Sequence, residues 1–316
     1  MNSSQSIVTV TLNPAIDRTL SISNFAAGKV NRVASSESHP GGKGVNVAML
    51  LADLGEHVTV TGFLGLGNAQ LFESLFEDME IEDQFIRLPG ETRTSLKIVD
   101  PSTQETTDIN FPGLIPSTQQ IDMLYSRVDA LAARDRWFVL SGSLPIGVEK
   151  EIYSRLVELI RFKGGRVALD TSGPALRLAI ASRPEIVKPN VHELSEIVGR
   201  ALNSPQEILE AARAALLDKG VKLAVISMGG EGAIFVDAER ALMARPPKVE
   251  VVSTVGAGDS MVAGLVYAQQ NKLPLEDCVR LATALGTHAV TRVDLGLETP
   301  TSHEMYYPGI SIDRIG

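Results

Sequence analysis

Short apolar runs alternate along this chain with longer segments in which apolar positions recur every three or four residues. The short runs predict buried strands at Ile7–Leu12, Val58–Phe63, Trp137–Ser141, Arg166–Asp170, Ile186-Val187 and Leu223–Ser227. The longer segments predict helices over Val45–Leu54, Asn68–Met79, Ile121–Ala133, Val148–Phe162, 205–219, Met261–Gln270 and Leu275–Val290. Strands that alternate with helices favour an α/β fold, in which a mainly parallel sheet is covered on both faces. Ligands bind such folds beyond the carboxyl ends of the strands.

Two regions follow a different pattern. Apolar and polar residues alternate near 19–35 and 92–111, which predicts half-exposed strands. We expect the two regions to pair as a small sheet outside the main core. No linker divides the chain, so we predict a single domain over 1–316 with a β lid formed by about 13–40 and 91–113.

Composition narrows the possible partners. The chain has 316 residues and a formal net charge of -9, which disfavours nucleic acids and anionic membranes as partners. Phosphates would have to be bound by a few well-placed cations and backbone N–H groups. The single cysteine, Cys278, excludes an intramolecular disulfide and fits a reducing cytoplasm. The N-terminus lacks the pattern of a signal peptide, and we expect a cytoplasmic protein without a membrane partner.

The segment Ser253-Thr254-Val255-Gly256-Ala257-Gly258-Asp259-Ser260 follows a strand-like run, Val249–Val252, and precedes an apolar helix. Its glycines let the backbone turn tightly, and the N–H groups of the first helical turn form an anion site. A carboxylate there can accept a hydroxyl proton while those N–H groups stabilise a phosphoryl group in transfer. The alternative is that Asp259 or Ser260 only caps the helix.

A second glycine-rich segment, Gly41-Gly42-Lys43-Gly44-Val45-Asn46, also opens a helix. Lys43 supplies a cation, and Asn46 can hydrogen-bond sugar hydroxyls or a phosphate. A flexible turn with a solvated lysine would explain the same residues. No Walker A loop and no protein-kinase motif set occurs, which excludes P-loop chemistry.

Two further segments have competing interpretations. Asn190 and Glu193 have the spacing of a helix capping box. Alternatively, these two residues lie near a hydrated Mg²⁺, which takes few protein ligands, and Lys188 lies near nucleotide phosphates. The stretch Ser227-Met228-Gly229-Gly230-Glu231-Gly232 is typical of a hairpin turn, or it contacts a nucleotide.

Polar residues near the predicted lid are candidates for binding the acceptor. Asp17 can bind sugar hydroxyls or serve as a turn residue. Lys29 and Arg93 can bind a phosphate, Arg93 bidentately, or be solvated charges. Ser141 ends a buried strand, where its hydroxyl can meet a ligand. The histidines lack metal-ligand spacing and no Gly-x-Ser-x-Gly elbow occurs, which disfavours a zinc site of that kind and a serine hydrolase.

Taken together and in this order, the segments resemble the ribokinase-like superfamily of carbohydrate kinases, specifically its phosphofructokinase B (PfkB) branch. The resemblance covers almost the whole chain and rests on Asn13–Asp17, Gly41–Asn46, Ser141–Pro145, Val187–Asn190, Glu193 and Ser253–Ser260. Within the branch, the likeness is strongest to the bacterial 1-phosphofructokinases, through Gly62–Gly65, Thr92-Arg93-Thr94, Asp108–Gly113 and the lysine at 43. Ser253-Thr254 stands where many superfamily members have Asp-Thr, but Ser-Thr is common in this branch.

The resemblance implies a three-layer α/β/α body with a mainly parallel central sheet and a small β-sheet lid that commonly pairs into a homodimer. It implies a phosphotransferase that uses ATP and Mg²⁺ to phosphorylate the 6-hydroxyl of D-fructose 1-phosphate, giving D-fructose 1,6-bisphosphate. Tagatose 6-phosphate and fructose 6-phosphate stay open as alternative acceptors. A non-catalytic sugar-phosphate sensor on the same fold is the alternative from another class.

The resemblance also implies a role for each candidate residue. Asp259 is the general base, and Gly256, Ala257 and Gly258 form the anion hole. The sugar phosphate is expected to contact Asp17, Lys29, Gly41, Gly42, Lys43, Asn46, Arg93 and Ser141. ATP is expected to contact Lys188, Asn190, Ser227, Gly229, Gly232, Ser253, Thr254, Val255, Gly256 and Gly258. Glu193 is expected to organise Mg²⁺.

Overall fold

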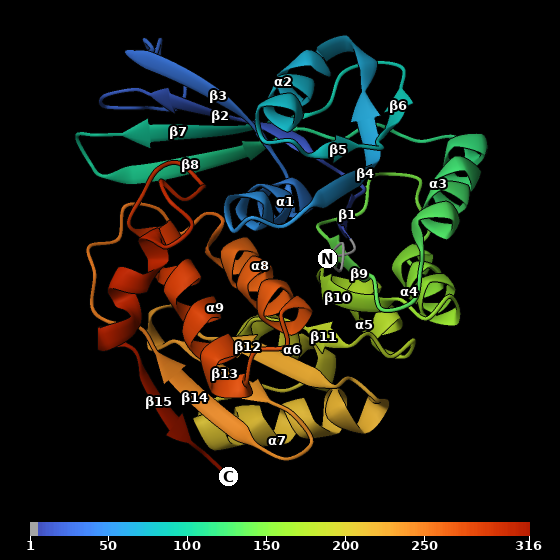
Figure 1. Cartoon of the computed structure of the whole chain (residues 1–316). Coiled ribbons are helices and arrows are strands. Elements are labelled where there is room, and N and C mark those ends of the chain that lie inside the picture. The colour runs from blue at the N-terminus through green and yellow to red at the C-terminus, as the bar shows by residue number, and fades with distance from the viewer. Residues whose placement is uncertain (1–5) are drawn as a thin grey trace.

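The apolar runs lie side by side in one large sheet (Figure 1). The computed structural model describes residues 6–316. The spatial order of the strands is β15 (Ser311–Arg314), β14 (Ala241–Arg245), β13 (Ala233–Val236), β12 (Leu223–Ser227), β11 (Ile186–Val187), β10 (Arg166–Asp170), β9 (Trp137–Ser141), β1 (Ile7–Thr11), β4 (Val58–Gly65) and β5 (Glu82–Asp83), with β6 (Ile86–Leu88) also beside β4. Strands from β12 to β5 run parallel, whereas β13, β14 and β15 pair antiparallel. The predicted parallel sheet is confirmed.

Helices cover both faces of this sheet and bury its apolar side chains. On one face lie α3 (Thr118–Leu131), α4 (Ile152–Phe162), α5 (Gly173–Ile180), α6 (Val191–Val198) and α7 (Pro205–Ala215). On the other face lie α1 (Lys43–Asp53), α2 (Gln70–Asp78), α8 (Ala257–Gln270) and α9 (Leu275–Val290). Short 3₁₀ turns occupy Leu66–Asn68, Leu217–Lys219, Gly229–Glu231 and Ser302–Gly309. Within residues 6–316, no helix combines the length and apolarity needed to cross a bilayer.

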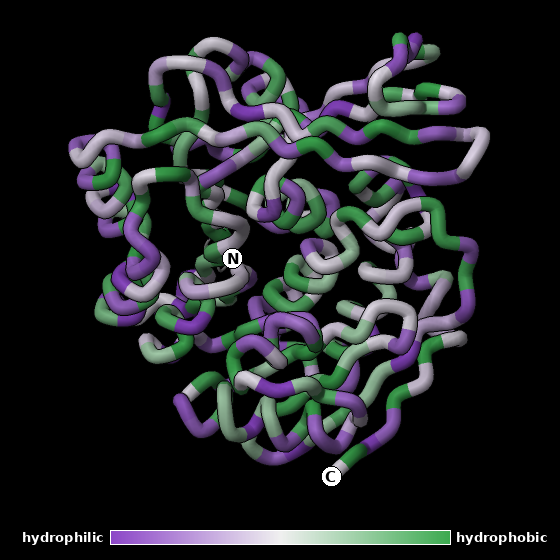
Figure 2. Tube along the Cα trace, turned by 180° about the vertical axis from the view of Figure 1, so that it is seen from behind, coloured by the Kyte–Doolittle hydropathy of each residue, from purple (hydrophilic) through white to green (hydrophobic). Residues whose placement is uncertain are grey.

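A separate four-stranded sheet lies across the top of the molecule (Figures 1 and 2). Its order is β3 (Ser35–Gly41), β2 (Ala15–Ser21), β7 (Thr94–Asp100) and β8 (Glu105–Asn110). The two half-exposed regions therefore do pair, as predicted. The predicted strand over 19–35 is wrong in its middle, however, because 22–34 forms a loop. Asp100 accepts backbone N–H bonds from Asn24 at 3.0 Å and Phe25 at 2.8 Å, which turns the chain away from the sheet after β2.

The segment before α8 also differs from its predicted form. Val249–Val252 is not a strand, and Val251 and Val252 are exposed. Instead, the N–H groups of Val252 and Ser253 both donate to the carbonyl of Val290, at 2.8 and 3.2 Å. The end of α9 therefore replaces a neighbouring strand as their partner. The helix predicted from Met261 begins four residues earlier, at Ala257.

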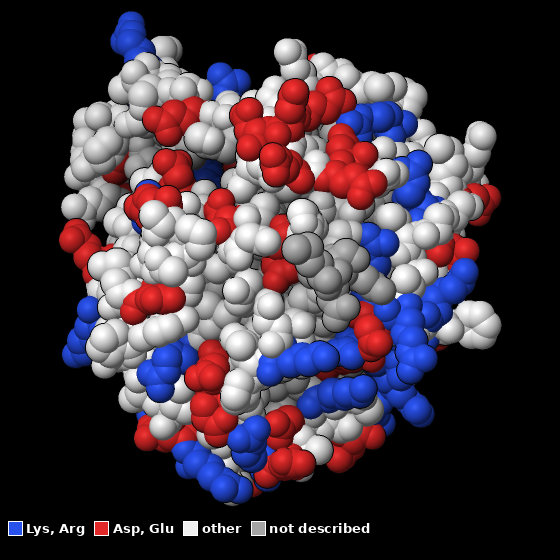
Figure 3. All heavy atoms as spheres, viewed as in Figure 1, with Lys and Arg blue, Asp and Glu red and all other residues white. Residues whose placement is uncertain are grey.

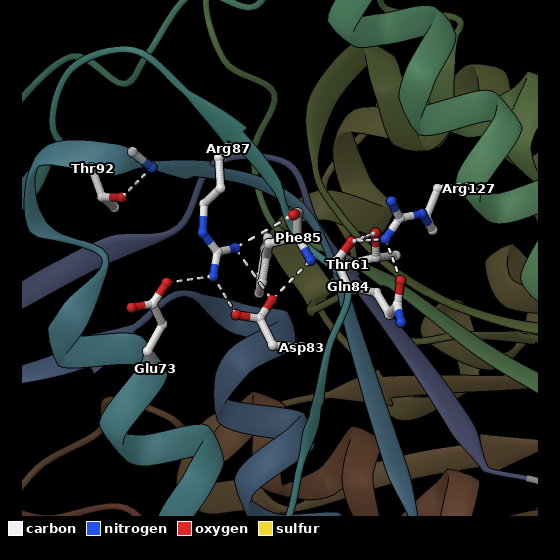
Figure 4. Close-up of polar contacts among 9 residues, drawn as sticks. Thr61, Glu73, Asp83, Gln84, Phe85, Arg87, Thr92 and Arg127 are labelled. Carbon is white, nitrogen blue, oxygen red and sulfur yellow. Dashed lines mark hydrogen bonds and ion pairs between the residues drawn. The ribbon is translucent and has the colours of Figure 1, made fainter.

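Ion pairs and hydrogen bonds fix the edge of the large sheet nearest the small sheet (Figure 4). Arg87 of β6 pairs with Glu73 of α2 at 2.8 Å and with Asp83 of β5. Beside them, the hydroxyl of Thr92 accepts the N–H of Gly65 at 2.9 Å. The Arg87 ion pairs join β6 to α2 and β5, and the Thr92–Gly65 bond holds the segment before β7 against the end of β4.

Candidate active site

Three parallel strands end in polar residues that lie next to one another. Thr11 of β1 is paired with Ser141 of β9, and Ser141 is paired with Asp170 of β10. All three are buried, and the hydroxyl oxygens of Thr11 and Ser141 have no hydrogen-bond partner among the described residues. The start of α1 approaches so closely that a Cβ on Gly44 would lie 2.2 Å from Thr11 Oγ1. The carboxyl ends of these strands thus place two unpartnered hydroxyls directly under the glycine-rich start of α1, at the edge where ligands bind such sheets.

Asp170 joins two lysines from different parts of the chain. Its carboxylate lies 3.1 Å from Lys43 Nζ of α1 and 3.3 Å from Lys188 Nζ, which follows β11. Burial alone would raise the pKa of Asp170, but the charges of Lys188 and Lys43 outweigh it and lower that pKa. Asp170 is therefore ionised and holds two ammonium groups at the end of the sheet, where they can face phosphate oxygens.

Asp259 lies in the first turn of α8, beside this group. Gly256 is the N-cap residue before α8 and has a φ of 77°, a conformation that favours glycine. Asn46 Nδ2 of α1 donates to Asp259 Oδ2 at 2.8 Å. Burial first, and then the nearby charge of Asp170, raises the pKa of Asp259 to about 6. A Cβ on Gly258 would lie 3.2 Å from Lys188 Nζ, which shows how closely that cation approaches the turn.

Residues of the small sheet reach the same end of the molecule. A Cβ on Gly41 would lie 2.3 Å from Asp17 Oδ2, so the strand pair β2–β3 is tight at its base. Gly42, with a φ of 110°, links β3 to α1. Arg93 precedes β7, and its buried Nε has no partner among the described residues. Lys29 lies exposed in the loop between β2 and β3.

The expected nucleotide side contains the capping box at the start of α6. Asn190 Oδ1 accepts the N–H of Glu193, and Glu193 Oε2 accepts the N–H of Asn190, both at 2.8 Å. The capping interpretation of this pair is thereby confirmed. Burial lowers the pKa of Lys43, but the charges of Asp170 and Asp259, with a smaller effect of Glu193, outweigh it and raise that pKa.

The glycine turn between β12 and β13 lies beside that cap. Asn190 forms a β-bridge with Ser227, and the hairpin interpretation of the turn is confirmed by the antiparallel pairing of β12 with β13. A Cβ on Gly229 would meet nothing within 4 Å, whereas one on Gly232 would lie 1.9 Å from Ala244 O. Gly232 is therefore required by packing. Ser253, Thr254 and Val255 form the loop that leads into α8.

Sequence reasoning missed Asp170, although it is the residue that brings Lys43 and Lys188 together. The available signal was its position at the end of a buried strand, beside one that ends in Ser141. Adjacent parallel strands present their last residues at one edge, so a buried acid there is a site candidate.

The chain matches known proteins both in sequence and in fold. The family model for the pfkB family carbohydrate kinases matches residues 6–302. The chain is 48% identical to a 1-phosphofructokinase of Rhodobacter capsulatus over 295 residues, covering 93% of each chain. It superposes with a TM-score of 0.89 and 30% identity on the phosphofructokinase-2 of Escherichia coli in complex with fructose-6-phosphate, covering 96% of this chain and 98% of that one. The tetrameric inhibited form of the same enzyme gives a TM-score of 0.89 and 31% identity, with the same coverage. The family match over residues 6–302 and the similarity in sequence and fold show that this chain belongs to the pfkB family of carbohydrate kinases.

Proposed function

We propose that this chain transfers the γ-phosphoryl group of ATP to the 6-hydroxyl of D-fructose 1-phosphate, with Asp259 as the general base. The observation that carries the proposal is the buried Asp259 carboxylate, held by Asn46 in the first turn of α8 and flanked by two lysines. The 48% identity to a 1-phosphofructokinase over 93% of the chain supports this choice of acceptor.

In the proposed reaction, Asp259 accepts the proton of the 6-hydroxyl as that oxygen bonds to the γ-phosphorus and ADP leaves. A carboxyl with a pKa of about 6 is ionised at neutral pH and still basic enough for this role. The backbone N–H groups of Gly256, Ala257 and Gly258 would face the phosphoryl group in transfer. Lys43 would neutralise the charge that develops there.

On the nucleotide side, Lys188 would contact the phosphates of ATP. Asn190, Ser227, Gly229 and the loop Ser253–Val255 would line its binding site. Glu193 fits a role in binding hydrated Mg²⁺, because its charge acts within the site and this ion needs few protein ligands. The ion would supply charge neutralisation of the phosphates.

The small sheet would act as the lid of the single domain. Asp17, Gly41 and Gly42 would contact the sugar, and Arg93 would bind its phosphate bidentately. Ser141 would supply a hydroxyl from the end of β9, and Lys29 would reach the phosphate from the loop between β2 and β3. Closure would exclude water and limit hydrolysis of ATP.

The lid also offers a surface for a second copy of the chain. Exposed apolar side chains occur on β8 and on the segments that flank the small sheet: Ile109, Phe111, Val30 and Val33. We propose a homodimer through this sheet in the reducing cytoplasm, consistent with the free, buried Cys278. Sedimentation of the wild type and of a variant with a charged residue at Ile109 tests the assembly. We expect the substitution to dissociate the dimer. A tetramer that the substitution leaves intact would rule out this interface.

A coupled assay of ADP release tests the reaction. The panel contains fructose 1-phosphate, fructose 6-phosphate, tagatose 6-phosphate and unphosphorylated fructose, each with Mg-ATP. We expect kcat/KM to be highest for fructose 1-phosphate by tenfold or more, about 1.4 kcal/mol of discrimination. If none of the four sugars gives ADP release, the result would contradict the kinase assignment and favour a sugar-phosphate sensor.

Fructose 6-phosphate is the second candidate acceptor. The structure of the Escherichia coli phosphofructokinase-2 with this ligand superposes over 96% of the chain. A ketose phosphate bound in the reversed orientation would use the same cations. A higher kcat/KM for this sugar in the same panel would retain the kinase reaction and change only the acceptor.

A further inference from the structure

A hollow on the surface lies at the opposite end of β9 and β10 from the candidate active site. Trp137 and Arg166 are paired at the start of these strands and line the hollow, whereas Ser141 and Asp170 end the same strands. Its volume is about 510 Å³. Small-molecule sites have volumes of roughly 300–1,000 Å³. Four residue steps along a strand separate the two sites by about 13 Å.

The lining of this hollow has three cations, Arg161, Arg166 and Lys222, against two carboxylates, although the chain as a whole has a net charge of -9. Arg166 forms an ion pair with Asp135 at 2.6 Å. The hydrogen bond from Arg166 and its charge, with smaller effects of the charges of Arg134 and Lys272, lower the pKa of Asp135. Three cations therefore surround one carboxylate. Lys222, also on the rim, is exposed and has no ion pair within residues 6–316.

Figure 3 shows the charged side chains on this face of the molecule. Lys and Arg side chains gather at the lower right of this face, over the region where Figure 1 shows α4, α5 and β11. The other carboxylate of the lining, Glu185, is already engaged. It accepts the N–H of Val167 at 2.7 Å and lies 3.7 Å from Arg161. The Glu185 carboxylate thus interacts with Arg161 and the N–H of Val167 and forms no ion pair with Lys222.

An aromatic side chain forms part of the wall. Trp137 is 2% exposed, and the guanidinium carbon of Arg166 lies 5.9 Å from its ring centroid. The indole N–H has no acceptor among the described residues. Trp137 is therefore a nearly buried part of the wall, close enough to the rim for its fluorescence to respond to an anion bound there.

We propose that this hollow binds a small organic phosphate at a site separate from both substrates. Lys222 and Arg166 contact the phosphate group, and the remainder of the ligand lies over the wall that contains Trp137. The size of the hollow selects a small molecule. Its position at the amino ends of the strands keeps this ligand away from Asp259.

The sequence provides a direct probe, because Trp137 is the only tryptophan. Its fluorescence is followed while inorganic phosphate or pyrophosphate is added to the full chain, with sodium chloride at matched ionic strength as a reference. We expect a saturable change with the phosphates and none with chloride. Lys222→Gln should weaken binding by roughly tenfold or more, the effect of losing one charge-assisted hydrogen bond. Lys222 has no partner to lose, so this variant should fold normally.

Lys150→Gln is the matched control, since it removes one exposed lysine charge outside the hollow. It should leave binding unchanged. The proposal is overturned if no saturable change occurs, if chloride gives the same change, or if Lys222→Gln binds as tightly as the wild type. The last result would identify an adventitious ion only.

Discussion

Replacing Asp259 with asparagine should both reduce catalysis and stabilise the folded chain. Loss of a general base lowers kcat by roughly 10²–10⁴. The gain in stability follows from burial, because Asp259 is 5% exposed and its pKa rises from 3.8 to about 6. The folded state then holds its proton more tightly than the unfolded state does. Stability is therefore lost as the pH rises from about 4 to about 6.

The size of this loss can be worked out from the two pKa values. A difference of about two units corresponds to about 3 kcal/mol at pH 8. Asparagine removes the charge but keeps an oxygen that can accept the 2.8 Å hydrogen bond from Asn46. The variant should therefore be more stable than the wild type by about 3 kcal/mol at pH 8, and by about half as much at pH 5.

Urea unfolding at both pH values measures this difference, and ADP release measures the loss of turnover. Asp170→Asn is the matched control, because it removes the other buried carboxylate of the site. Despite burial, Lys188 and Lys43 lower the pKa of Asp170, so its charge stabilises the fold above about pH 4 and this contribution is lost in acid. Removing it should destabilise the chain by about 3–5 kcal/mol. An Asp259→Asn variant that is no more stable than the wild type at pH 8, or whose advantage does not shrink at pH 5, would show that the buried charge of Asp259 does not destabilise the fold.

Three other predictions concern the site and its support. Arg93→Ala should raise KM for the sugar phosphate far more than KM for ATP; equal effects on both would contradict a phosphate clamp. The acid limb of kcat should lie near pH 6 and move to lower pH in Asp170→Asn, because a negative charge beside Asp259 is gone; a pH profile of both chains measures the shift, and an unmoved limb would mean that another group titrates. Gly232→Ala should destabilise the chain by roughly 1–3 kcal/mol in urea, because its Cβ would lie 1.9 Å from a backbone oxygen of β14. Gly229→Ala, which meets nothing within 4 Å, should cost only about 1 kcal/mol, and a reversed order would refute the packing argument.

Buried strands were the most predictable elements of this fold. The predicted ends of β9, β10 and β12 match the structure because an apolar run flanked by polar residues leaves little freedom in where a buried strand begins and ends. The exposed segment Val249–Val252 was mispredicted as strand-like because β-branched residues favour a strand only where a neighbouring strand pairs with them. No strand lies there, and α9 supplies the hydrogen-bond acceptor instead.

For the site, local sequence was enough to single out the glycine-rich helix starts, Lys43 and Asp259, since phosphate-binding turns need small residues and a helix N-terminus. Local sequence carried no information on which groups meet. Asn46 and Asp259 are 213 residues apart, and Lys43 and Asp170 are 127 apart. Parallel strands place their carboxyl ends at one edge, and helices packed on the sheet bring these side chains within hydrogen-bonding distance. The raised pKa of Asp259 follows from that burial and from the charge of Asp170, so it is a property of the folded chain alone.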